Sequence, residues 1–154
     1  MKKNIIVILL VVFCQSFGCP SKKQFHYSNV MQCGDTIRAS EDDSPKTWHL
    51  VVVSSEKCGF CLRAKKDIQK HNMPDMAKVT FLEYDLEPAS LSGIASDSLY
   101  QNCEVVQANS CGDLRDFFPV FLLFKTETQD LAYAEEGWDT GTMEKLKSAM
   151  TSGK

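Results

Sequence analysis

The sequence feature that most constrains the fold is a pair of cysteines, Cys58 and Cys61, placed directly after a hydrophobic stretch. That stretch, residues 48–53, is rich in β-branched side chains and is typical of a central strand buried on both faces. Residues 58–71 follow with helical spacing of their apolar side chains and contain no helix breaker before Pro74. The pattern therefore predicts a strand that turns directly into a helix, with one cysteine at the helix N-terminus and the other one turn later.

This placement gives the two thiols different chemistry. A cysteine at a helix N-terminus lies beside unpaired backbone N–H groups and the positive end of the helix dipole, which stabilise a thiolate. Lys57 adds a positive charge next to Cys58. Cys61 lies on the same helix face, close enough to form a disulfide with Cys58. An exposed thiolate beside a second thiol is what thiol–disulfide exchange requires. Lys65 and the charged residues next to it are expected to form the solvated face of this helix.

Other segments of the chain alternate between strand and helix patterns. Strands are predicted over residues 78–84, 118–124 and 129–135, and a closing helix over residues 140–150. Residues 90–103 are rich in serine and form a candidate helix. Strand, helix, strand, helix, two strands and a helix is an α/β order with a mixed sheet.

Residues 1–18 have the layout of a secretory signal peptide. Two lysines precede an apolar run, residues 5–13, which is shorter than the roughly 20 apolar residues of a stable membrane span. A buried N-terminal strand or helix is the alternative. Small residues allow cleavage before Cys19, and the same segment resembles a bacterial lipoprotein box in which Cys19 is lipidated. We expect an exported protein with three parts: a signal peptide (1–18), an N-terminal extension with one short strand at most (19–45) and the main domain (46–154).

The cysteine count points to disulfides, redox chemistry or a metal site. Cleavage would remove Cys14 from the seven cysteines, and the six that remain can pair completely. Cys103 and Cys111 bracket a polar segment with little apolar content, and we predict a structural disulfide between them. Cys33 pairs with Cys19 if Cys19 keeps its thiol, and is left single if Cys19 is lipidated.

The charge of the chain narrows the set of partners. A formal net charge of −3 argues against a surface built to neutralise nucleic-acid phosphates. Zinc at the cysteine pair is an alternative to redox chemistry, with Cys103, Cys111 or His71 as further ligands. The spacing of the second cysteine pair is wider than zinc motifs use, so no metal is assigned.

From about residue 48 to residue 150 the chain resembles the thioredoxin-like family. The resemblance rests on the strand that precedes the C-x-x-C motif, on residues 118–125, which look like the family's strand with a cis-proline near its start, and on Gly137 after the last strand. It implies a three-layer α/β/α sandwich with a mixed central sheet. It also implies a cis bond before Pro119 and contact between Pro119 and the Cys58–Cys61 pair.

The resemblance carries expectations for function. Cys58 and Cys61 are then catalytic, and the substrate groove is formed by Gly59, Phe60, Phe118 and Pro119. The protein would be a thiol–disulfide oxidoreductase of the periplasm or cell envelope, acting on protein thiols and disulfides and recycled by a redox partner protein. No cofactor is required, and the membrane is contacted only through a lipid at Cys19. The alternative is a non-catalytic thioredoxin-fold binding protein, with zinc or a structural disulfide at the cysteine pair.

Two departures from thioredoxin bear on the direction of electron flow. Val52 stands where thioredoxin has a buried acid that moves protons to and from the second cysteine. Phe60, before the second cysteine, looks more like the periplasmic disulfide isomerases. A stabilised Cys58 thiolate and the lack of an internal base together predict a more oxidising couple than thioredoxin.

Overall fold

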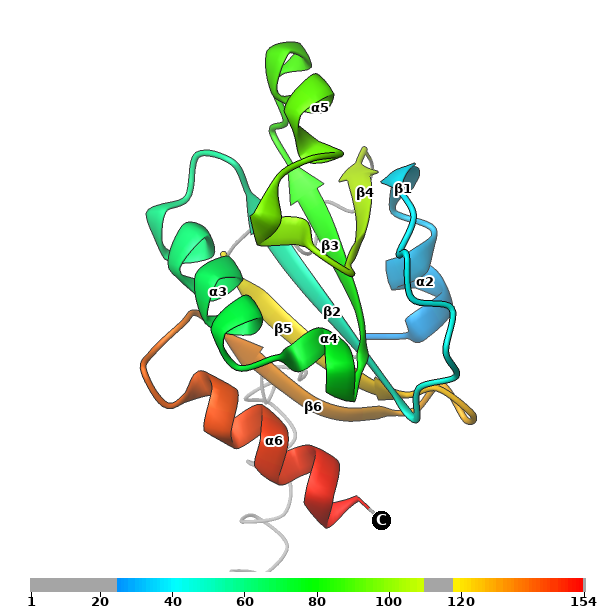
Figure 1. Cartoon of the computed structure of the whole chain (residues 1–154). Helices are drawn as coiled ribbons and strands as arrows, with labels where there is room; N and C mark the ends of the chain where they lie inside the picture. Colours follow the sequence, from blue (N-terminus) through cyan, green and yellow to red (C-terminus); the bar gives the residue numbers. More distant parts are fainter. Residues whose placement is uncertain (1–24, 110–117, 154) are drawn as a thin grey trace, which may run out of the picture.

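The computed structural model describes residues 25–109 and 118–153. Figure 1 shows helices packed on a central sheet, with the C-terminal helix on the same side as the helix that follows the cysteine pair. In chain order the elements are α2 (Tyr27–Met31), β1 (Gly34–Arg38), β2 (Trp48–Ser55), α3 (Gly59–Lys70), α4 (Met73–Met76), β3 (Lys78–Tyr84), α5 (Pro88–Ile94), the 3₁₀ turn η1 (Ser98–Tyr100), β4 (Glu104–Ala108), β5 (Val120–Lys125), β6 (Leu131–Glu136) and α6 (Thr142–Ser152).

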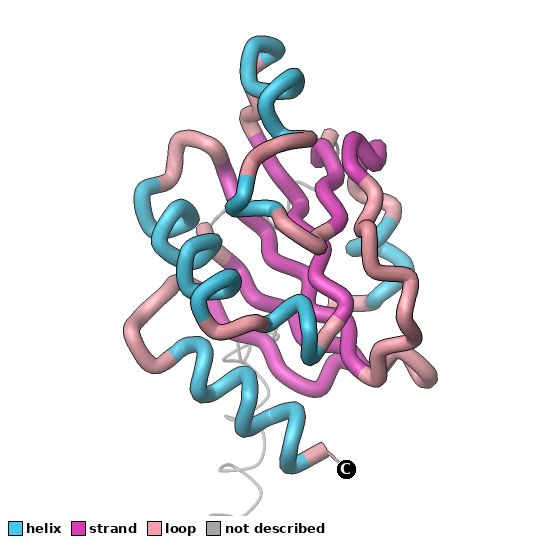
Figure 2. The backbone as a smooth tube through the Cα atoms, viewed as in Figure 1, coloured by secondary structure: helices cyan, strands magenta, loops and turns pink. Residues whose placement is uncertain are grey.

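The strands form one mixed sheet in the order β1-β4-β3-β2-β5-β6. β2 lies inside the sheet, parallel to β3 and antiparallel to β5. Every residue of β2 is buried, because both faces of the sheet are covered there. Figure 2 shows the strands as a single twisted layer with α3, α4 and α6 on one side. The predicted α/β class and mixed central sheet are confirmed.

Successive side chains of β2 enter two different hydrophobic cores. Leu50 and Val52 face the core that packs under α3, α4 and α6. Val51 and Val53 face a second core, which is covered by α2. Helices thus cover both faces of the sheet, which gives three layers: helix, sheet and helix. The cysteine pair follows the C-terminal end of β2.

The N-terminal extension contains more structure than the sequence predicts. Besides β1, which pairs antiparallel with β4, it forms the short helix α2. The Tyr27 hydroxyl lies 2.8 Å from Nδ1 of His49, so α2 is tied to the central strand. The predicted signal peptide, residues 1–18, and Cys19 lie outside the described residues. No helix within the described residues is long and apolar enough to cross a membrane.

The serine-rich segment 90–103 is not the single helix that its composition favours. α5 starts earlier, with Pro88 in its first turn, and ends at Ile94, and η1 follows as a separate turn. The strand β4 then begins at Glu104, and the sequence analysis does not predict it. Val105 and Val106 are its only two strongly apolar residues, and the strand forms because β1 and β3 pair with it from both sides.

Candidate functional site

The C-x-x-C motif lies at the point where β2 turns into α3. Cys58 caps the N-terminus of α3, with extended backbone angles of φ −98° and ψ 113°. Its Sγ accepts the backbone N–H of Cys61 at 3.2 Å, which satisfies one of the unpaired donors of the first helical turn. Cys58 is half-buried and carries a free thiol. The predicted position of this cysteine, at the helix N-terminus with access to solvent, is confirmed.

Cys61 lies one turn further along α3 and is fully buried. Its thiol is also free. Burial, together with the hydrogen bond to Cys58, raises the pKa of Cys61 to about 12, and the nearby ammonium of Lys65 only partly opposes this rise. The two thiols are therefore unequal: one is accessible at the helix N-terminus, and the other is shielded behind it in protonated form.

The segment before β5 meets Cys58 from the opposite side. The peptide bond between Phe118 and Pro119 is cis, as the family resemblance implies. The Cys58 Sγ lies 3.8 Å from the carbonyl oxygen of Phe118, the donor in this weak contact being the thiol. The carbonyl of Pro119 accepts the N–H of Gly137 at 2.7 Å. Gly137 has φ 84°, a left-handed conformation that favours glycine.

The rim around Cys58 combines a large exposed aromatic side chain with positive charge. Phe60 is 54% exposed, although it lies between two cysteines in the motif. Arg63 places its guanidinium 5.5 Å from the centre of the Phe60 ring and 6.0 Å from the Trp138 ring. An added Cβ at Gly59 would meet no other atom within 4 Å, so the space next to this residue, beside Cys58, is open. The structure thus brings the predicted groove residues to Cys58 from two separate segments.

The predicted disulfide between Cys103 and Cys111 is wrong. Cys103 is a buried, free thiol that donates a hydrogen bond to the carbonyl of Gln101 at 3.3 Å. Burial raises the pKa of Cys103 to about 12. The residues after Cys103 form β4, so backbone pairing rather than a covalent bridge holds them. Cys111 itself lies outside the described residues.

Cys33 does form a disulfide. It is completely buried in the core beneath α2. Since the free cysteines of the described part of the chain are Cys58, Cys61 and Cys103, the partner of Cys33 lies outside the described residues.

A buried ionic cluster lies behind the cysteines, and the sequence analysis misses it. Lys65 Nζ lies 2.6 Å from Glu83 Oε1 and 2.8 Å from the hydroxyl of Tyr100. Ser54 donates a further hydrogen bond to Glu83 Oε1 at 2.5 Å. The expectation that Lys65 lies on the solvated face of α3 is therefore wrong, because this residue is only 5% exposed. The signal available in the sequence is an acid inside the hydrophobic stretch 78–84 and a lysine four residues after Cys61.

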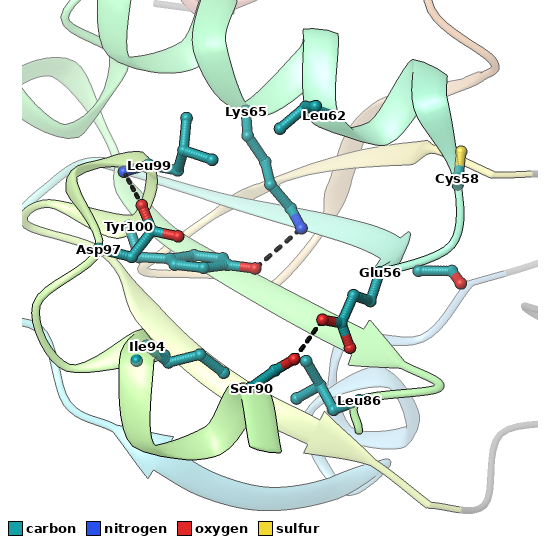
Figure 3. Close-up of a pocket in the computed structure, with 12 residues that line it drawn as sticks. Glu56, Cys58, Leu62, Lys65, Leu86, Ser90, Ile94, Asp97, Leu99 and Tyr100 are labelled. Carbon is teal, nitrogen blue, oxygen red and sulfur yellow. Dashed lines mark hydrogen bonds between the residues drawn. The ribbon is translucent and has the colours of Figure 1, made fainter. Parts of the chain in front are cut away.

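A cavity of about 430 Å³ opens beside Cys58 (Figure 3). Within residues 25–109 and 118–153 no group of three or more histidine, cysteine, aspartate or glutamate side chains could hold a metal ion. The cavity lining consists of Ser55, Glu56, Cys58, Leu62, Lys65, Leu86, Ser90, Gly93, Ile94, Asp97, Leu99 and Tyr100.

The comparisons with known proteins depend on structure alone. No protein-family model matches the sequence, and no curated protein matches it. StoA from Bacillus subtilis is similar in structure, with 15% identity, a TM-score of 0.50, and coverage of 70% of this chain and 84% of that chain. A putative thiol:disulfide interchange protein DsbE from Chlorobium tepidum has 11% identity and a TM-score of 0.53, covering 79% of this chain and 96% of its own.

A third similar structure comes from Streptococcus pneumoniae. It is the exposed lipoprotein thioredoxin Etrx1, with 16% identity and a TM-score of 0.50, and the match covers 66% of this chain and 84% of that chain. At these identities the likeness concerns the fold. Together with the cis-proline and the C-x-x-C motif at the end of β2, it shows that the chain has the thioredoxin-like fold.

Proposed function

We propose that this thioredoxin-like protein is an exported thiol–disulfide oxidoreductase that exchanges disulfides with protein substrates through Cys58 and Cys61. One observation carries the proposal. An accessible thiol at the N-terminus of α3 lies beside the carbonyl that precedes cis-Pro119, with a buried second thiol one turn behind it. Thiol–disulfide exchange needs one accessible nucleophile and one shielded thiol that can resolve the intermediate.

The first step uses Cys58 as the nucleophile. Its thiolate attacks one sulfur of a substrate disulfide, forms a mixed disulfide and releases the other substrate sulfur as a thiolate. The N–H of Cys61, which already points at Cys58 Sγ, stabilises the attacking thiolate. The backbone of Phe118, next to cis-Pro119, lies beside Cys58 and is placed to pair with an extended substrate segment, and the exposed ring of Phe60 supplies apolar contact.

The second step uses Cys61. Because Cys61 is protonated at neutral pH, its thiol attacks the Cys58 sulfur of the mixed disulfide, forms the Cys58–Cys61 disulfide and passes its proton to the second substrate sulfur, which leaves as a thiol. Two electrons have then passed from the cysteine pair to the substrate, and a redox partner protein returns them. The reverse sequence oxidises a substrate dithiol through the same mixed disulfide.

Export is supported by three observations of different kinds. Residues 1–18 have the layout of a signal peptide, and Cys33 is disulfide-bonded, as is common in oxidising compartments. One structurally similar protein is described as an exposed lipoprotein. We place the protein in the periplasm or cell envelope, with Cys19 as its candidate lipid attachment site.

The test separates catalysis from binding. The purified protein is expected to accelerate the reduction of insulin by dithiothreitol, Cys58→Ala to abolish this activity, and Cys61→Ser to accumulate mixed disulfides with exported proteins. Cys103→Ser is the matched control, because it removes a buried free thiol that lies outside the site. If the wild-type protein has no insulin activity and Cys61→Ser traps nothing, the protein is a non-catalytic binding protein with the same fold.

A further inference from the structure

The cavity beside Cys58 is separate from the predicted substrate groove of Gly59, Phe60, Phe118 and Pro119. None of these four residues lines it. It lies between α3 and the α5–η1 segment, and Cys58 is part of its wall (Figure 3). Its volume of about 430 Å³ falls within the range of pockets that bind small molecules, so one long side chain can enter it.

Four aliphatic side chains form part of the wall of this cavity. Leu62 comes from α3 and Ile94 from α5, while Leu86 and Leu99 come from the segments on either side of α5. These side chains offer contact to the methylene groups of a long substrate side chain.

Two carboxylates, Glu56 and Asp97, also line the cavity, and both are held in place by hydrogen bonds. Glu56 accepts hydrogen bonds from the hydroxyl of Ser90 and, at 3.0 Å, from the backbone N–H of Glu87. Asp97 uses Oδ1 to accept the N–H of Leu99 at 2.9 Å. The bond from Ser90 is the largest cause of a lowered pKa at Glu56, which keeps this carboxylate ionised at neutral pH.

The positive charges near the cavity already have partners. Lys65, the only lysine or arginine in the lining, is paired with Glu83 at 2.6 Å. At the rim, Lys57 pairs with Glu87 at 3.1 Å. Arg38 donates to the backbone carbonyls of Ile94 and Asp97 and pairs with Glu41 at 3.6 Å. The charge left for a ligand is therefore negative, and it comes from Glu56 and Asp97.

We propose that this cavity binds a lysine or arginine side chain that lies next to the reactive cysteine of a substrate protein. The inference rests on the proposed function, since Cys58 is part of the cavity lining and a substrate sulfur bonded to it lies close to the cavity. Adjacent Cα atoms are about 3.8 Å apart, so the neighbouring residue of the substrate starts at the cavity mouth. Its aliphatic stem then lies against Leu62 and Leu99, and its cationic head reaches one of the two carboxylates, Glu56 or Asp97.

The test measures the rate at which Cys58 attacks peptides in the Cys61→Ser variant. Each peptide carries one cysteine as a mixed disulfide with 5-thio-2-nitrobenzoate, and attack by Cys58 releases the coloured thiolate while the peptide stays bonded to the protein. The peptides differ only at the two residues that flank the cysteine, which are arginine, norleucine or glutamate. We expect the arginine peptide to react about fivefold faster than the glutamate peptide, with norleucine between them, and the difference to shrink at high salt.

Variants identify the carboxylates responsible. Glu56→Gln with Asp97→Asn keeps the hydrogen-bond acceptors and removes both charges, so the preference for arginine over glutamate should fall to less than about twofold. Glu127→Gln is the matched control, since it removes one exposed acid in the turn between β5 and β6. Iodoacetamide labelling of Cys58 is measured in every variant, and the peptide rates are divided by it, so that a change in the reactivity of the thiol itself is not counted as a change in peptide preference.

The outcomes separate this inference from the proposed function. Equal rates for the three peptides, a preference for glutamate, or an arginine preference that persists in the double variant would overturn the cationic pocket while leaving thiol exchange intact. No reaction of Cys58 with any peptide would instead overturn the proposed function, and the pocket with it.

Discussion

Lys65 Nζ lies 2.6 Å from Glu83 Oε1, and the two side chains are 6% and 0% exposed. Tyr100 bridges the pair, donating its hydroxyl to Glu83 at 3.2 Å. The second carboxylate oxygen of Glu83 is buried and has no hydrogen-bond partner among the described residues. The ion pair also lies close to the two cysteines, because Lys65 is one helical turn beyond Cys61 on the buried face of α3.

Removing only the lysine should be strongly destabilising. Lys65→Met leaves the Glu83 carboxylate buried without its counter-ion, and we expect the free energy of unfolding to fall by about 3–5 kcal/mol. The measurement is urea denaturation at neutral pH. Lys66→Met is the matched control, because Lys66 is exposed on the same helix, and it should change stability by less than about 0.5 kcal/mol.

A double variant distinguishes charge from packing. Lys65→Met combined with Glu83→Gln removes both charges and keeps the hydrogen-bonding atoms that Ser54 and Tyr100 use. It should recover at least about half of the stability lost in Lys65→Met, because no uncompensated charge remains buried. Equal destabilisation in the single and double variants would mean that the lysine stem, rather than its charge, holds this part of the core.

The sequence predicts the part of the site that depends on local structure. The strand 48–53, the helix after Cys58 and the accessible position of that cysteine follow from residue patterns a few positions apart. The cis bond before Pro119 is confirmed as well, but it depended on the family resemblance rather than on local residues.

What the sequence could not predict depends on pairing between distant segments. β4 is a strand because β1 and β3 flank it, and Cys103 is buried for the same reason. From the sequence alone Lys65 is expected to be solvated, because its partner Glu83 lies on the distant strand β3. The cavity likewise needs α5 and η1 to lie across from α3. Such relationships are set by tertiary structure, which no short window of sequence contains.

A second prediction concerns the stability of the fold in acid. His49 is 1% exposed, with Nδ1 next to Tyr27 and Nε2 2.8 Å from the Thr80 hydroxyl. Burial, with a smaller contribution from Lys78, lowers its pKa from 6.5 to about 4. The unfolded chain therefore binds a proton near pH 6.5 that the folded chain binds only near pH 4, so stability is lost as the pH falls through this window.

The lost stability should reach about 3 kcal/mol at pH 4, since each pKa unit corresponds to about 1.4 kcal/mol. Urea denaturation between pH 7 and pH 4 measures it, and His49→Gln should remove most of this pH dependence. His26→Gln, which changes an exposed histidine, should leave the dependence as in the wild type. A His49→Gln curve that parallels the wild-type curve would contradict the assignment.

A third prediction identifies the partner of Cys33 as Cys111. The carbonyl of Cys33 accepts the N–H of Asn109 at 2.8 Å, and Gly34 lies opposite Ala108 in the sheet. Cys111 follows Asn109 by two residues, a span of at most about 7 Å, which is comparable to the Cα separation of disulfides. Non-reducing peptide mapping should recover a Cys33–Cys111 peptide from the mature protein. A Cys33–Cys19 peptide would contradict this pairing and would also show that Cys19 is not lipidated.

A fourth prediction concerns alkylation of the two thiols of the candidate site, Cys58 and Cys61. With a pKa of about 12, Cys61 has a thiolate fraction of only about 10⁻⁵ at pH 7. Iodoacetamide should therefore modify Cys58 first, and Cys61 should stay unmodified until the protein is unfolded. Mass spectrometry of partially labelled protein gives the order, with Cys103→Ser removing the one other thiol that is free among residues 25–109 and 118–153. Faster labelling of Cys61 would reverse the assigned roles.

The reduction potential of the Cys58–Cys61 couple is the last prediction. The reduced state is stabilised by the N–H that Cys61 directs at Cys58 Sγ and by the N-terminus of α3, and Val52 supplies no acid beneath the pair. A stabilised reduced form raises the potential, so we expect a value above the roughly −270 mV of thioredoxin.

Lys57, which the sequence suggests as a contributor, is 68% exposed and paired with Glu87. Lys57→Gln should therefore shift the potential by less than about 15 mV. Equilibration with glutathione buffers measures both values, and a wild-type potential at or below that of thioredoxin would favour a reductase instead.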